Sequence, residues 1–254
     1  MPILEVFPNP TVKQVIFQIT FPNLFYIESK IGDLQMKIMD KFPESSMVLQ
    51  HQVMFAVGDE NKIDDIRQNT PQEQVGKIWK FDNQSLGYQL QVQGNSLSIT
   101  SSFHKTYNNQ NSVNRFRDII EAVLKPFLDL THLPTVNRIG LRYIDECPFK
   151  EKTTKTFRAH FKSCFSTTRF SIEESVEHQY AVLVKRGEYS MRYVEQYNFN
   201  NNPSLLILDF DASANNIASD KCLEITDQLH DLIANEYELT IKKPVYAYMR
   251  KIKK

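Results

Sequence analysis

The residues best suited to bind an anion lie in the stretch R-I-G-L-R-Y-I-D-E, at positions 138–146. Alternation along a β-strand places Arg138 and Arg142 on the face opposite the apolar residues, about 13 Å apart. Gly140 lies between them, where the missing side chain would let a ligand or a backbone approach. Guanidinium groups form paired hydrogen bonds with phosphate or carboxylate, so this face could bind an anionic group. The alternative is that the arginines stack on tyrosines or form cross-strand ion pairs with a carboxylate of this chain, which could be Glu195, Asp209 or Asp211.

Two further groups of polar residues could belong to a binding surface. Gln14 and Gln18 alternate with apolar residues in a predicted strand at 12–21, and would extend the arginine face if that strand lies near 136–145. His104, Arg115 and Arg117 surround the start of a predicted helix and could form a small basic corner. The alternative for these three residues is an ordinary solvated surface.

The sequence contains no recognised catalytic or metal-binding motif. G-x-S-x-G, H-E-x-x-H and a glycine-rich phosphate loop are all missing, and the six histidines have no metal-ligand spacing. The three cysteines are widely spaced, which argues against a disulfide framework and against a zinc site. Asp209 and Asp211 share a strand face and could bind a divalent cation, although pairing with arginine is commoner. We therefore predict no catalytic residues, no metal and no cofactor, and we favour a protein that is not an enzyme.

Composition limits the classes of partner and compartment. The 254 residues include 30 basic and 30 acidic side chains, so the formal net charge is zero. Long-range attraction of nucleic acid or of an anionic membrane is therefore not expected from the chain as a whole. No apolar run approaches the ~20 residues that span a bilayer, and the N-terminal sequence does not resemble a secretory signal. We expect a cytoplasmic protein without a membrane partner.

Hydrophobic periodicity predicts two consecutive halves with the same order of elements. Each half is expected to contain one strand, a helix, about four antiparallel strands and a long helix. In the first half the expected ranges are a strand at 12–21, a helix at 25–42, strands at 52–57, 76–81, 87–92 and 96–102, and a helix after Ser112. In the second half they are a strand at 136–145, a helix at 154–165, strands at 169–175, 179–186, 189–197 and 205–211, and a helix at 219–239.

This pattern predicts an α+β fold in which antiparallel sheet packs on long helices. The repeated β-α-β4-α order is similar to the tandem architecture of TATA-binding-protein-like domains. The two halves would be residues 1–135 and 136–254, packed as one compact unit. The alternative is a single larger sheet that grips the long C-terminal helix.

Several short motifs together resemble a known family. They are the P-x-V-x-x-V-x-F-x-I opening at 10–19, the W-x-F strand at Trp79 and Phe81, the R-I-G-L-R-Y-I-D strand, and a C-terminal helix with Leu229, His230, Leu239 and Thr240. The chain resembles a sporadically distributed prokaryotic family of similar length, whose members are functionally uncharacterised. The family pattern usually has asparagine where this chain has Asp145. The resemblance supplies no reaction, and the patchy distribution suggests an accessory role in a mobile or defence-type system.

These observations together predict a cytoplasmic, non-enzymatic binding module with a protein partner. The surface expected to bind carries Arg138, Arg142, Gln14 and Gln18. The first alternative is a nucleic-acid-binding protein that uses the same arginines. The second is a hydrolase that acts on nucleic acid or a nucleotide. The sequence leaves the oligomeric state open.

Overall fold

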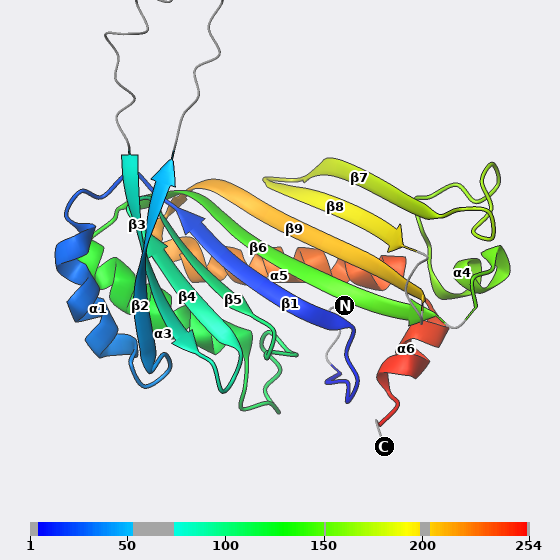
Figure 1. Cartoon of the computed structure of the whole chain (residues 1–254), viewed down its shortest axis with the longest axis horizontal. Coiled ribbons are helices and arrows are strands. Elements are labelled where there is room, and N and C mark those ends of the chain that lie inside the picture. The colour runs from blue at the N-terminus through cyan, green and yellow to red at the C-terminus, as the bar shows by residue number, and fades with distance from the viewer. Residues whose placement is uncertain (1–4, 53–73, 150, 199–203, 253–254) are drawn as a thin grey trace, which may run out of the picture.

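One antiparallel sheet of nine strands runs through the computed structural model (Figure 1). The structure describes residues 5–52, 74–149, 151–198 and 204–252. The strands are β1 (Val12–Thr20), β2 (Glu44–Gln52), β3 (Gln74–Asn83), β4 (Tyr88–Gln93), β5 (Ser96–Ser101), β6 (Thr135–Phe149), β7 (Glu177–Arg186), β8 (Tyr189–Asn198) and β9 (Ser204–Ala218). Their order across the sheet is β2-β3-β4-β5-β1-β6-β9-β8-β7, so β1 and β6 lie side by side at its centre.

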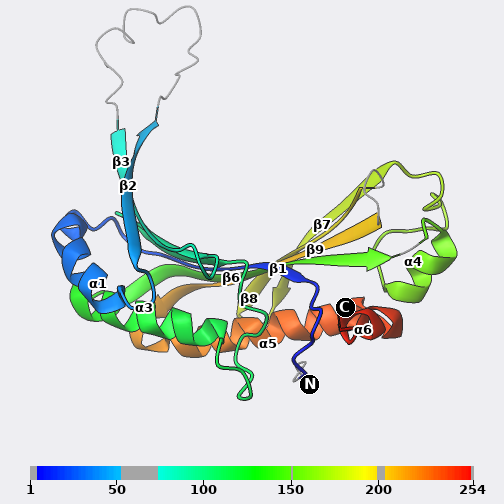
Figure 2. The same ribbon diagram turned by 60° about the horizontal axis from the view of Figure 1, so that its bottom comes forward.

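The helices lie on one side of this sheet, and the sheet bends away from them. The described residues form five α-helices, which are α1 (Ile31–Ile38), α3 (Phe116–Thr131), α4 (Thr154–His160), α5 (Cys222–Thr240) and α6 (Lys243–Met249). Figure 2 shows α1, α3 and α5 below the sheet, while the β2–β3 hairpin and the strands β7 and β9 rise on the other side. The face without helices is therefore concave. No helix in the described ranges is long and apolar enough to cross a membrane.

Alternating side chains explain which face carries the helices. Phe17 and Ile19 of β1 and Ile139 and Leu141 of β6 are fully buried, and all four point to the helix side. Apolar residues of α3 recur at intervals of three and four, so one side of this helix is buried in the same hydrophobic core. The buried area of such side chains is the main source of stability for a sheet of this kind.

The predicted fold of two β-α-β4-α halves in a TATA-binding-protein-like tandem is wrong. The structure is a single continuous sheet, because β1 from the first predicted half pairs with β6 from the second along most of its length. The alternative of a single larger sheet is confirmed, but this sheet does not grip the C-terminal helix. The sheet curves away from α5, which lies against its convex face (Figure 2).

One strand predicted in the second half is not formed, because local side-chain hydrogen bonds favour turns there. Residues 169–175 form turns instead of a strand. The Ser171 hydroxyl donates to Glu174 at 2.8 Å and accepts from the Glu174 backbone N–H at 3.3 Å. Serine side chains that bond to nearby backbone in this way compete with strand pairing. The helix predicted at 154–165 is also shorter than expected. The observed helix α4 ends at His160.

Candidate functional site

Four of the predicted binding residues lie together on the concave face. Gln14 and Gln18 of β1 and Arg138 and Arg142 of β6 are all partly exposed, and the two strands pair directly. Neighbouring strands add further polar side chains in the same register. We call this surface the polar face and define it by Gln14, Gln18, Asp82, Gln89, Gln91, Ser98, Arg138, Arg142, Asp209 and Asp211.

The arginines of the polar face are paired with carboxylates of β9. Arg142 forms two hydrogen bonds with Asp209, at 2.7 and 2.6 Å, and Arg138 contacts Asp211 at 3.0 Å. The hydrogen bond from Arg142 to Asp209 raises the pKa of this guanidinium. The observed arrangement is therefore cross-strand ion pairing, which was the alternative interpretation of the sequence. An anionic ligand would have to compete with an aspartate at each arginine.

The arginines nevertheless remain accessible. The exposed fraction of the side chain is 32% for Arg138 and 39% for Arg142, so a partner can still reach both side chains. The gap expected at Gly140 is filled, because a Cβ there would lie 2.6 Å from Nη1 of Arg138. Arg138 thus runs along the strand over Gly140 towards Asp211. Glycine at position 140 allows the Arg138 side chain to approach the backbone closely, and this side chain leaves no opening for a ligand.

Amide side chains extend the ordered part of the polar face across β4. Gln91 donates to Gln89, and Gln89 in turn donates to Asp82 of β3 at 2.5 Å. Together with the two ion pairs, these contacts fix side chains on both sides of β1. The carboxylates of Asp209 and Asp211 are used in the ion pairs, and the described residues contain no cluster of three or more potential metal ligands.

The predicted basic corner is not formed. His104 is only 4% exposed, its Nδ1 lies 2.8 Å from the Ser101 hydroxyl, and its ring packs on Phe116. Burial lowers the pKa of His104 to about 4, so this residue is neutral at physiological pH. Arg115 is paired with Asp118 at 2.7 Å. The prediction was wrong for His104 because the buried rings around it come from separate segments of the chain.

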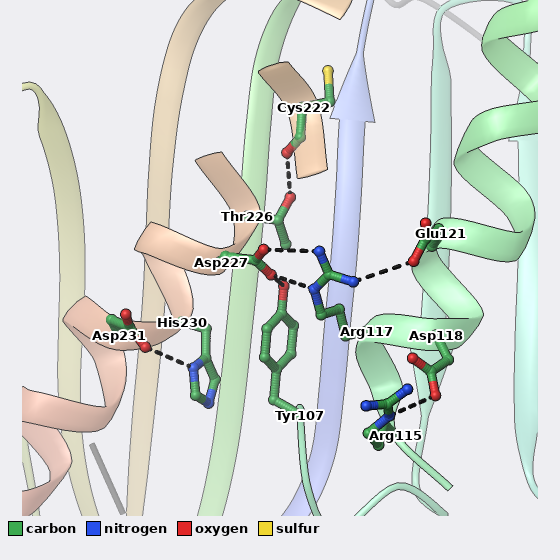
Figure 3. Close-up of polar contacts among 10 residues, drawn as sticks. All are labelled: Tyr107, Arg115, Arg117, Asp118, Glu121, Cys222, Thr226, Asp227, His230 and Asp231. Carbon is green, nitrogen blue, oxygen red and sulfur yellow. Dashed lines mark hydrogen bonds and ion pairs between the residues drawn. The ribbon is translucent and has the colours of Figure 1, made fainter. Parts of the chain in front are cut away.

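Arg117 belongs to a cluster of polar side chains that connects α3 to α5 (Figure 3). We call this cluster the polar lock, and its members are Tyr107, Arg117, Glu121 and Asp227. Arg117 forms two hydrogen bonds with Asp227 of α5, at 2.8 and 3.0 Å, and one with Glu121 at 3.1 Å. The hydroxyl of Tyr107 donates to the same Asp227 carboxylate at 2.7 Å. Tyr107 also stacks on His230, with ring centroids 4.2 Å apart. These contacts hold the loop that precedes α3 against α5.

Removing the lock should destabilise the protein by a measurable amount. Asp227→Ala leaves the buried Tyr107 hydroxyl and the Arg117 guanidinium without their shared acceptor. We expect the free energy of unfolding to fall by about 2 kcal/mol in urea denaturation. Glu224→Ala is the matched control, because Glu224 is an exposed carboxylate of α5 whose ion pair with Lys221 lies outside these contacts. Equal stability of the two variants would contradict the lock.

A pocket on the helix side was not predicted from the sequence. It has a volume of about 130 Å³ and lies between the N-terminal segment, the loop at 105–109, β6, α5 and α6. Asp145 and Tyr143 of β6 line it, together with Thr11, His230 and Tyr237. Asp145 is 6% exposed, and burial raises its pKa to about 7, although a hydrogen bond from Thr11 at 2.8 Å opposes this effect.

One signal in the sequence could have pointed to this pocket. Asp145 follows Ile139, Leu141 and Tyr143 on the same side of the strand, so alternation alone assigns its carboxyl to the buried face. A carboxyl group on a buried face is uncommon and often marks a functional site. The other walls of the pocket come from segments distant in sequence, which a strand pattern does not connect.

Comparison with known proteins adds no identification. No protein-family model matches this chain, and a search of curated proteins finds no significant match. The resemblance to a sporadically distributed prokaryotic family therefore stays a prediction.

Proposed function

We propose that this protein is a non-enzymatic binding module of the cytoplasm that takes a protein partner on the polar face. The observation that carries the proposal is the shape and order of that face. It is concave and is not covered by any helix of the described residues (Figure 2). Its charged side chains and the amides of Gln89 and Gln91 are fixed by mutual contacts. Ordered side chains lose little conformational freedom on binding, which favours association.

The charge of the polar face favours a protein over nucleic acid. Each arginine has its own aspartate, at 3.0 Å for Arg138 and 2.6 Å for Arg142. Affinity for nucleic acid depends on basic groups that release counterions from phosphates, and compensated arginines do this poorly. Amide and hydroxyl groups, in contrast, suit the mixed hydrogen bonding of protein interfaces. The formal net charge of zero supports the same choice.

The biological setting that we propose rests on the family resemblance. A patchily distributed prokaryotic family suggests an accessory factor of a mobile or defence-type system. A binding module without catalytic motifs fits such a role, because it would recruit or restrain another protein. The partner should therefore be encoded by the same genetic system.

A bulky residue at the centre of the polar face should block the partner. Gln18 lies opposite Gly140 in the pairing of β1 with β6, so Gln18→Trp places a large ring between the two arginines. We expect the amount of partner recovered by affinity capture from the native host to fall at least tenfold, roughly 1.4 kcal/mol in binding free energy. Lys125→Trp, at an exposed position of α3 on the other side of the sheet, is the matched control.

The outcome separates the alternatives. Loss of a nucleic acid from the captured material in Gln18→Trp, with no protein lost, would favour the nucleic-acid-binding alternative. Equal recovery of the partner by the two variants would contradict the proposed surface.

A further inference from the structure

The pocket on the helix side has the size of a small-molecule site. Its volume of about 130 Å³ is close to that of an apolar cavity of about 150 Å³ that accepts benzene. It lies on the opposite side of the sheet from the polar face, so a ligand here would not contact a partner bound on that face. The walls include four aromatic rings, those of Phe7, Tyr107, Tyr143 and Tyr237.

The inner end of the pocket carries a carboxyl group without a counter-charge. Among the described residues, only Thr11 donates a hydrogen bond to Asp145, and it does so to Oδ1 alone. The Tyr237 hydroxyl lies 2.5 Å from the Thr11 hydroxyl, which gives a chain from Tyr237 through Thr11 to Asp145. Burial raises the pKa of Asp145 to about 7, and no basic side chain lowers it. A buried carboxylate of this kind gains stability from any cation that reaches it.

The remaining polar groups also suit a hydrogen-bond donor. The hydroxyl of Tyr143 is buried and has no partner within the described ranges. His230 stacks on Tyr107, and its Nδ1 lies 3.3 Å from a carboxylate oxygen of Asp231. Figure 3 marks this contact with a dashed line. When Nδ1 donates to Asp231, the other ring nitrogen becomes an acceptor. The pocket therefore combines several acceptors with aromatic faces, and this combination attracts organic cations.

We propose that this pocket binds a small protonated amine, with its ammonium group on the Asp145 carboxylate and its carbon skeleton against the tyrosine rings. The ammonium supplies the charge and the donors that the inner end of the pocket lacks. The rings of Tyr107, Tyr143 and Tyr237 supply apolar contact and cation–π attraction. A neutral molecule of the same shape gains the apolar contact and at most a hydrogen bond without charge attraction, and an anion is repelled.

The affinity for an amine should rise with pH. A proton on Asp145 competes with the ammonium group, and the carboxyl changes from mostly protonated at pH 6 to mostly ionised at pH 8. This change corresponds to an increase in affinity of about tenfold. The titratable and polar groups that interact with Asp145 are Thr11, Tyr143, Cys147 and Tyr237. His230, Lys105 and the Glu5–Arg250 ion pair lie along the pocket walls or next to them.

Isothermal titration with three matched probes tests the proposal. Benzylamine, benzyl alcohol and benzoate share one ring and differ in charge. We expect benzylamine to bind at pH 8 at least tenfold more tightly than benzyl alcohol, and benzoate not to bind. Asp145→Asn should lose at least tenfold in affinity for benzylamine, whereas Asp129→Asn, at an exposed position of α3, should leave it unchanged.

A second variant guards against a change in folding. Ala234 lines the pocket from α5, and Ala234→Phe should fill it without touching Asp145. Loss of benzylamine binding in both pocket variants, with Asp129→Asn unaffected, supports the proposal. Equal affinity for benzyl alcohol, unchanged affinity in either pocket variant, or no binding of benzylamine by the wild-type chain would overturn it.

Discussion

Replacing Asp145 with asparagine should make the protein more stable than the wild-type chain at pH 8. The folded-state pKa of Asp145 is raised by burial to about 7, from an ordinary value of 3.8. A raised pKa means that the folded protein holds this proton more tightly than the unfolded chain. The stabilisation is therefore complete below about pH 4 and is lost as the pH rises through 7. A shift of this size corresponds to about 4 kcal/mol.

The comparison between the two chains isolates Asp145 from other titrating groups. His104 contributes in the opposite direction, because burial lowers its pKa to about 4 and its stabilisation is lost as the pH falls below 6.5. His104 is present in both chains, so its effect cancels in the difference. In urea denaturation from pH 4 to pH 8, the stabilities of the wild type and of Asp145→Asn should diverge with rising pH in favour of the substituted chain.

The control for this prediction is a carboxyl group in solvent. Asp129→Asn removes an exposed aspartate from α3 and should leave the pH profile of the free energy of unfolding within about 0.5 kcal/mol of the wild type. Parallel profiles for the wild type and Asp145→Asn would show that the carboxyl is not held in a buried pocket.

Replacing Glu195 with alanine should cause the largest loss of stability among substitutions of buried polar residues. Glu195 of β8 is fully buried and accepts hydrogen bonds from the Tyr193 hydroxyl at 2.6 Å, from the Cys164 backbone N–H at 2.9 Å and from the Ser163 hydroxyl. Alanine leaves all three donors without an acceptor. An orphaned buried donor costs about 1–3 kcal/mol. The Tyr193 hydroxyl is buried, whereas Ser163 is partly buried and Cys164 is exposed, so we expect a total loss of about 3 kcal/mol.

Two further variants, compared by urea denaturation, show whether the hydrogen bonds cause this loss. Glu195→Gln keeps one acceptor oxygen and should fall between the wild type and Glu195→Ala in the free energy of unfolding. Glu188→Ala removes an exposed glutamate from the turn between β7 and β8 and should change stability by less than about 0.5 kcal/mol. A loss as small in Glu195→Ala as in Glu188→Ala would contradict the role of Glu195 in fixing residues 163–165 against β8.

Local elements with a clear hydrophobic period could be predicted from the sequence. The strand expected at 12–21 is β1, and the strand expected at 136–145 lies inside the longer β6. The long amphipathic helices correspond to α3 and α5. Alternation also placed both arginines on the face opposite the apolar residues, where the structure has them.

Long-range pairing could not be predicted in the same way. The bonding of β1 to β6 joins segments more than a hundred residues apart, and side-chain period does not specify a partner strand. The same limit applies to the pocket, whose walls come from five segments. Of the expected first-half elements, the strand at 52–57 and the loop at 58–74 fall almost entirely outside the described residues. The observed second strand is β2, which begins earlier, at Glu44.

The ion pairs of the polar face show a second limit. The sequence was compatible with two interpretations of the arginines: ion pairs with carboxylates such as Asp209 and Asp211, or a free surface that binds an anion. Only the positions of β9 beside β6 bring these carboxylates within reach, at 3.0 Å for Asp211 and 2.6 Å for Asp209. The pairing compensates the charge of both arginines, and this compensation is one basis of our proposal that the partner is a protein.

Site-specific photo-crosslinking in the native host tests the proposed surface most directly. A photoreactive residue in place of Gln18 lies on the polar face, and one in place of Lys125 lies on the exposed side of α3. We predict that the Gln18 position gives a crosslinked adduct with one defined protein and that the Lys125 position does not. An adduct from the Lys125 position alone, or no protein adduct from the Gln18 position, would contradict a partner that docks on the polar face.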